Sequence, residues 1–121
     1  MSEIQDFVAN AHGDLDYVRT TLGQQSTLAN ASWDWGDGDW ETALGAAAHM
    51  GRRDIAELLL AHGARMDIFA AAMLDEVDAV RALLRLQGDA RGPHGIPLRA
   101  HAEAGDAKRV LELLDSSLEA G

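Results

Sequence analysis

The sequence predicts an all-α fold in which short antiparallel helix pairs stack side by side. The clearest pair lies in residues 41–64, where Gly51 separates two helical patterns because glycine tolerates the positive φ of a tight turn. In the second helix, Ile55, Leu58 and Leu59 recur at helical spacing and form one apolar face. Two helices this short cannot bury such a face alone, so copies of the pair are expected along the chain.

Copies of the pair occur at two constant offsets. Residues 7–22 match residues 69–84 at an offset of 62, and the pair around Gly51 matches the last pair, around Gly105, at an offset of 54. The chain is therefore expected to form one solenoid-like domain, residues 1–121, made of four helix pairs. The expected boundaries of the repeats are about residues 2–31, 32–66, 67–92 and 93–121.

The central pair carries a recognisable motif. Residues 42–47, TALGAA, stand where one repeat family has T-P-L-H-x-A, and a leucine run at 58–60 precedes Gly63-Ala64. On these residues the stretch resembles an ankyrin repeat. The inter-helix turns have a mean spacing near 31 residues, against an ankyrin period of about 33. The resemblance implies a small four-repeat ankyrin solenoid that binds other macromolecules and has no catalytic activity.

The charge of the chain argues against a nucleic-acid partner. It has 20 acidic and 10 basic residues, and residues 1–51 carry a net charge of −7 out of the total of −10. Nucleic-acid phosphates are bound by clustered Lys and Arg side chains, and this sequence has no such cluster. A protein partner with a basic surface would suit the N-terminal half. The alternative is that the charge only keeps a small protein soluble.

Other features of composition limit the kind of protein and the compartment that the sequence suggests. The chain has no cysteine and no apolar run of membrane-spanning length, and its N-terminus is acidic, unlike a signal peptide. A cytoplasmic monomer without cofactor or membrane contact is expected, with self-association through the open end of the stack as an alternative. Nine arginines against one lysine are typical of a GC-rich bacterial genome.

The longest connection, residues 23–40, holds all three tryptophans among aspartates. In an ankyrin stack such a connection forms a β-hairpin finger, and tryptophan is enriched at binding hot spots. We favour partner binding for Trp33 and Trp35, and packing against the neighbouring repeat for Trp40. The candidate partner-binding residues in this connection are Trp33, Trp35, Asp37, Asp39 and Trp40.

The resemblance also implies a concave binding face built from residues that precede each inter-helix turn. Met50, Met73 and Leu74 would give this face an apolar, exposed centre. The alternative is that Met73 and Leu74 fill the gap left by a missing finger. The candidate partner-binding residues on this face are His12, His49, Met50, Met73, Leu74 and Glu103.

Metal-binding and catalytic patterns are weak in this sequence. Carboxylates crowd residues 34–41, but their order does not match an EF-hand loop, and the histidines lack an HExxH spacing. His12 and His49 fall at nearly equivalent positions of adjacent repeats and are expected to lie near each other, where we favour a surface role over a metal or proton-handling pair. His94 is assigned to a Gly-Pro-His-Gly turn.

The sequence therefore predicts a non-enzymatic protein-interaction module, an adaptor or inhibitor that presents its concave face to an unidentified protein. The alternative function is a binder of small molecules or metal ions that uses the Trp/Asp-rich loop at residues 33–41.

Overall fold

The computed structural model describes residues 2–87 and 91–120 of the chain, and it confirms the predicted all-α fold. The α-helices in these ranges are α1 (Glu3–Asn10), α2 (Leu15–Gln24), α3 (Ala43–His49), α4 (Arg53–Ala61), α5 (Ile68–Met73), α6 (Val77–Gln87), α7 (Leu98–Ala104) and α8 (Lys108–Ala120). The connections contain the 3-10 turns η1 (Ser26–Asn30) and η2 (Pro93–Gly95) and the strands β1 (Ser32–Asp34) and β2 (Trp40–Thr42).

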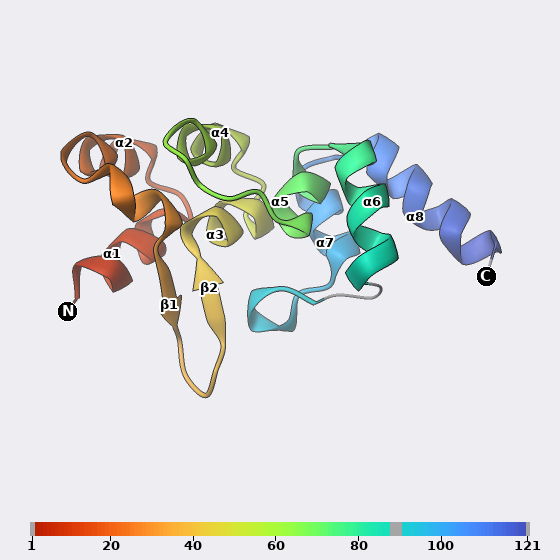
Figure 1. The fold of residues 1–121 in the computed structure, drawn as a ribbon, viewed down its shortest axis with the longest axis horizontal. Coiled ribbons are helices and arrows are strands. Elements are labelled where there is room, and N and C mark those ends of the chain that lie inside the picture. The colour runs from red at the N-terminus through yellow and green to blue at the C-terminus, as the bar shows by residue number, and fades with distance from the viewer. Residues whose placement is uncertain (1, 88–90, 121) are drawn as a thin grey trace.

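Consecutive helices pack as antiparallel pairs, and the pairs stack along the long axis of the molecule (Figure 1). The first helices of the pairs form one row, in which α3 packs on α1 and α5 packs between α3 and α7. The second helices form the other row, where α2 contacts α4 and α6 contacts α8. This is the helix–turn–helix stack expected of a solenoid, because each pair buries its apolar face against its neighbours.

Several helices begin at a side chain that caps their first turn. Ser2, Asp14 and Asp67 accept hydrogen bonds from the backbone N–H groups that open α1, α2 and α5. Asp75 lies in the turn before α6, and its carboxylate accepts a hydrogen bond from the backbone N–H of Val110 in α8. Asp75 thus ties the turn of the third pair to the start of the last helix.

The apolar core consists of two clusters, one in each half of the stack. The N-terminal cluster includes Phe7, Leu44 and Ile55, and the C-terminal cluster includes Ile68 and Val110. Within residues 2–87 and 91–120, no helix is long and apolar enough to cross a membrane.

The exposed apolar centre expected at Met50, Met73 and Leu74 is formed only in part. Met50 is 52% exposed, but Met73 and Leu74 are only 1% and 6% exposed and belong to the N-terminal core cluster. The physical reason is the short connection at residues 62–67, which contains no strand and lets α5 pack directly between α3 and α7. The expectation of an exposed surface at Met73 and Leu74 was therefore wrong.

The last inter-helix turn differs by one residue from the predicted correspondence. Gly51 has the positive φ that was expected (67°), but in the last turn the left-handed residue is Asp106 (φ 51°) and Gly105 has φ −92°. A Cβ atom on Gly105 would collide with the carbonyl oxygen of Met73. Glycine is therefore needed at Gly105 for close helix packing rather than for the turn itself.

The connection before α3 forms a β-hairpin, β1–β2, that projects from the row of first helices (Figure 1). Its strands pair in antiparallel register, with Trp33 opposite Glu41. The carboxylate of Asp34 accepts hydrogen bonds from the backbone N–H groups of the turn glycines and so stabilises the turn. Because side chains alternate along a strand, Glu41 points into the protein and is 1% exposed, whereas Trp40 points outward and is 61% exposed. The expectation that Trp40 packs against the neighbouring repeat was wrong.

Candidate functional site

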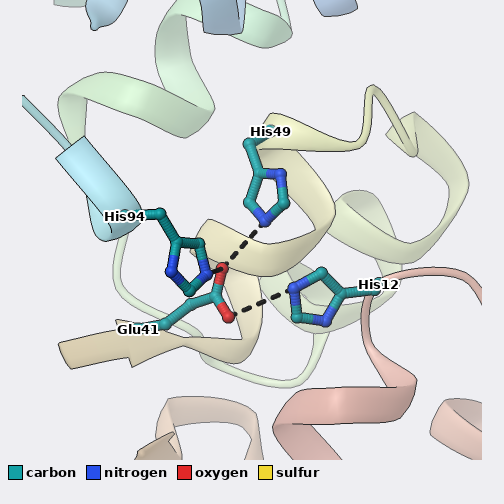
Figure 2. Close-up of side chains that lie close together, drawn as sticks. All are labelled: His12, Glu41, His49 and His94. Carbon is teal, nitrogen blue, oxygen red and sulfur yellow. Dashed lines mark hydrogen bonds and ion pairs between the residues drawn. The ribbon is translucent and has the colours of Figure 1, made fainter. Parts of the chain in front are cut away.

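Three histidines surround the buried carboxylate of Glu41 (Figure 2). The Nε2 atom of His12 lies 3.1 Å from Oε1 of Glu41, and the Nε2 atoms of His49 and His94 lie 2.9 Å and 3.5 Å from Oε2. One donor atom from each of the four residues can be chosen so that all four lie within 4.8 Å of one another. We call His12, Glu41, His49 and His94 the histidine–glutamate cluster.

Four separate elements bring these side chains together. His12 follows the end of α1, Glu41 is the middle residue of β2, and His49 is the last residue of α3. His94 lies in η2, within the connection of residues 91–97 that leads into α7. The side chains become more exposed away from the carboxylate: that of Glu41 is fully buried, and those of His49, His12 and His94 are 13%, 27% and 37% exposed.

A second layer of hydrogen bonds orients the cluster. Nε1 of Trp35 donates to Oε1 of Glu41 at 2.8 Å. Asp39 accepts two hydrogen bonds from His94, one from the backbone N–H and one from the ring Nδ1, both at 2.7 Å. Nδ1 of His12 donates to the backbone carbonyls of residues 8 and 9, at the end of α1. The imidazoles of His12 and His94 are therefore fixed through Nδ1, and both turn Nε2 toward Glu41.

These contacts determine the charge state of the carboxylates. Burial alone would raise the pKa of Glu41, but the hydrogen bonds from His12, His49 and Trp35 outweigh it and hold that pKa well below its usual value. The hydrogen bond to Glu41 raises the pKa of His12 against the opposing effect of burial. The hydrogen bond from the backbone of His94 lowers the pKa of Asp39. The cluster therefore holds an ionised carboxylate at neutral pH.

A separate groove lies between the hairpin and the connection at residues 91–97. It has a volume of about 360 Å³, and its lining includes Asp67 and Phe69 at the start of α5. Trp40 of the hairpin and Pro93 of the connection also line it. An exposed aromatic side chain beside a groove of this kind is suited to bind an apolar group.

The candidate residues chosen from the sequence fall into different environments. His12 and His49 lie near each other as predicted, with ring centroids 5.0 Å apart, and Asp39 lies beside them in the second layer of the cluster. Trp35 is 37% exposed, with its indole N–H directed to Glu41. The remaining candidates lie outside the cluster: Trp33 is half-buried in β1, Asp37 is exposed in the hairpin turn, and Glu103 is exposed on α7.

Sequence reasoning missed the part played by His94, and it considered Glu41 only as one carboxylate of the loop at residues 33–41, without its histidine partners. The signal for Glu41 was its place between Trp40 and Thr42 in a short strand, which directs it inward when its neighbours point outward. For His94 the local sequence gave only a turn, since its contact with Asp39 joins residues 55 positions apart.

Comparison with known proteins agrees with the fold. Residues 39–70 match the family model described as Ankyrin repeat. Searches for similar curated proteins and for similar solved structures found no significant match. The matched segment runs from the hairpin through α3 and α4 into α5, so the stack of helix pairs contains an ankyrin repeat. Ankyrin repeats generally mediate protein–protein interaction and are typically not enzymes.

Proposed function

We propose that this protein is a non-enzymatic recognition module, an adaptor or inhibitor, that binds a protein partner through its hairpin and the adjoining groove. The observation that carries the proposal is the exposure of Trp40, 61%, at a position inside the matched ankyrin repeat. A large aromatic side chain left in water beside a groove gains much by being covered, and tryptophan is enriched among the residues that dominate binding energy.

The surroundings of Trp40 suggest the chemistry of the partner. The groove beside it would take an apolar side chain, while Asp37 in the hairpin turn would attract a Lys or Arg of the partner. Strand pairing and the hydrogen bonds of Asp34 hold the hairpin in shape, so little entropy is lost on binding. Met50 and Glu103, both exposed, remain further proposed contacts on the concave face.

The proposal is tested by quantitative affinity capture from a lysate of the source cell with three baits. We expect a stoichiometric protein to be retained by the wild type and lost by Trp40→Ala. The control bait is Leu86→Ala, which removes a side chain that is 84% exposed on α6 and does not line the groove, and it should retain the partner. Equal retention by all three baits, or retention by none, would contradict a role for Trp40 in partner binding.

A second candidate function is the binding of a small molecule in the same groove, whose volume of about 360 Å³ is in the usual range for such sites. A titration with a panel of small molecules, followed by tryptophan fluorescence, would then give a saturable response. That response should be lost in Trp40→Ala and kept in Leu86→Ala. The absence of any response across the panel favours the protein partner.

A further inference from the structure

We propose that the histidine–glutamate cluster is a binding site for one divalent transition-metal ion of the zinc type. Its members, residues 12, 41, 49 and 94, lie in the first two helix pairs, the hairpin and the connection before α7, yet one ligand atom from each lies within 4.8 Å of the others. Three imidazole nitrogens and one carboxylate oxygen are ligands that zinc commonly takes in proteins.

The spacing of the donor atoms fits such an ion. A tetrahedral zinc site with metal–ligand bonds of about 2.0–2.1 Å has its ligand atoms about 3.3–3.4 Å apart. The Nε2 atoms of His49 and His94 lie 2.9 Å and 3.5 Å from the same oxygen, Oε2 of Glu41, and these distances bracket that value. Nε2 of His12 lies 3.1 Å from the other oxygen, Oε1. The four possible ligand atoms all lie within 4.8 Å of one another. Small rotations of the more exposed imidazoles would therefore bring them to the distances of a metal site.

The hydrogen bonds behind the cluster select the correct nitrogen for metal binding. Nδ1 of His12 faces backbone carbonyls and Nδ1 of His94 faces the carboxylate of Asp39, and these groups only accept hydrogen bonds. Each Nδ1 must therefore carry a proton, which leaves the lone pair of a neutral ring on Nε2. Histidine ligands of metals usually have such a carbonyl or carboxylate partner on the other nitrogen.

The three imidazole rings stand close together around the one carboxylate. The ring of His49 lies 5.0 Å from that of His12 and 5.7 Å from that of His94 by centroid distance.

The backbone at His94 is a further sign of function. His94 has φ 60° and ψ 17°, a left-handed conformation that is unfavourable for a non-glycine residue. The left-handed position is taken by a histidine even though Gly92 and Gly95 lie in the same turn. Asp39 holds this conformation by accepting the backbone N–H as well as the ring N–H of His94. Strained residues held in this way concentrate at binding sites.

The ligand set also indicates which ions would bind. Ca²⁺ and Mg²⁺ prefer oxygen ligands and would not favour three imidazoles. Zn²⁺, Co²⁺, Ni²⁺ and Cu²⁺ all suit imidazole, and zinc is the ion for which a tetrahedral site is usual. The partly exposed rings of His12 and His94 offer an access path for the ion from solvent.

The test is isothermal titration calorimetry with Zn²⁺ on the full chain after treatment with a chelator, together with elemental analysis of the protein as purified. We expect one Zn²⁺ per chain, a rise in melting temperature on its addition, and no comparable binding of Ca²⁺. His94→Gln removes an exposed ligand and should weaken zinc binding at least tenfold. His62→Gln is the matched control, because His62 is an exposed histidine outside the cluster, and it should bind zinc as the wild type does.

Circular dichroism shows whether each variant keeps its helices, and His12→Gln provides a second ligand variant if His94→Gln does not fold. A stoichiometry far from one, or equal zinc affinity in the wild type and both ligand variants, would overturn the proposal. An equal loss of zinc affinity in His62→Gln and His94→Gln would also overturn the proposal, because zinc would then not bind specifically at this cluster. With Co²⁺ in place of zinc, the visible absorption band of a tetrahedral site should appear in the wild type and be lost in His94→Gln.

Discussion

The connection before α3 and the connection before α7 both supply side chains to the histidine–glutamate cluster, but they keep their shape by different means. The first is a hairpin whose two strands pair with each other and whose turn is fastened by Asp34. The second, residues 91–97, has the 3-10 turn η2 and a single bridge between Arg91 and Pro97. It is fastened to the hairpin by the contacts between His94 and Asp39.

The difference shows how the site is assembled. The hairpin can present the carboxylate of Glu41 by its own strand geometry, while the second connection needs the hairpin to hold its histidine in place. We therefore expect changes at Glu41 to affect the whole fold and changes at His94 to affect the site alone.

Glu41→Ala should have the largest effect. Its carboxylate is the common acceptor for Trp35, His12 and His49, and its removal leaves these groups without a partner. Removing one member of a buried charged network typically costs about 3–5 kcal/mol, and we expect a loss near the lower end of that range. Urea denaturation in the presence of a chelator measures the loss.

The matched control for Glu41→Ala is Glu57→Ala, which removes an exposed glutamate paired with Arg53 on α4. Such a surface pair contributes less than about 0.5 kcal/mol. Similar stabilities for the two variants would mean that the hairpin does not depend on its buried carboxylate.

The pH dependence should be governed in part by His101, which is buried beneath the second connection. Its ring packs against Phe69, its Nδ1 donates to the carbonyl of Pro97, and burial lowers its pKa. Below its unfolded pKa of about 6.5 the unfolded chain binds this proton more readily than the folded chain, so stability falls as the pH drops from about 7 to 5.

His12 acts in the opposite sense, because its pKa is raised in the folded protein and its contribution to stability is lost as the pH rises. The contribution of His101 is therefore isolated by comparing the wild type with His101→Leu across this pH range, in the presence of a chelator. The stability difference between the two should shift in favour of the variant at low pH. A difference that does not change with pH would contradict the buried, neutral state of His101.

Asp39→Asn should loosen the second connection and leave the hairpin intact. The carboxylate of Asp39 accepts two hydrogen bonds from His94, and an amide replaces it poorly as a partner for an imidazole N–H. Hydrogen exchange is expected to speed up at residues 92–97 and to stay unchanged in β1 and β2. Asp37→Asn, in the same hairpin turn, is the control, and equal protection in both variants would mean that Asp39 does not hold the second connection.

His94→Gly should have the smallest effect on stability. Glycine relieves the left-handed strain, worth about 1–2 kcal/mol, and this gain offsets the lost contacts of a half-exposed ring. The free energy of unfolding of the metal-free protein should therefore change by less than about 1 kcal/mol, while zinc binding is lost. A large destabilisation would show that the second connection depends on the imidazole itself rather than on its backbone.

Much of the fold could be predicted from the sequence because its signals are local. The apolar periodicity of Ile55, Leu58 and Leu59 and the glycine at position 51 are visible within one helix pair. The caps at Ser2, Asp14 and Asp67 need only the residues that follow them.

The site was harder to predict because its geometry depends on how the pairs stack. The nearness of His12 and His49 followed from equivalent positions in adjacent repeats. The burial of Met73 and Leu74 follows from the packing of α5 between α3 and α7. The contact between His94 and Glu41 joins residues that are separated in the sequence by two helix pairs. The suggestion of a metal binder at residues 33–41 included Glu41, but it did not include the histidines that would complete the ligand set.

The short connection at residues 62–67 explains why these distant parts meet. A finger at this position would stand above the start of α5, between the hairpin and the second connection, in the space that the groove now occupies. Asp39 could not then reach His94, and Glu41 would lose its third imidazole. The short loop thus makes room for both the groove and the cluster, so an insertion ahead of Asp67 is expected to remove both sites while every residue that forms them is kept.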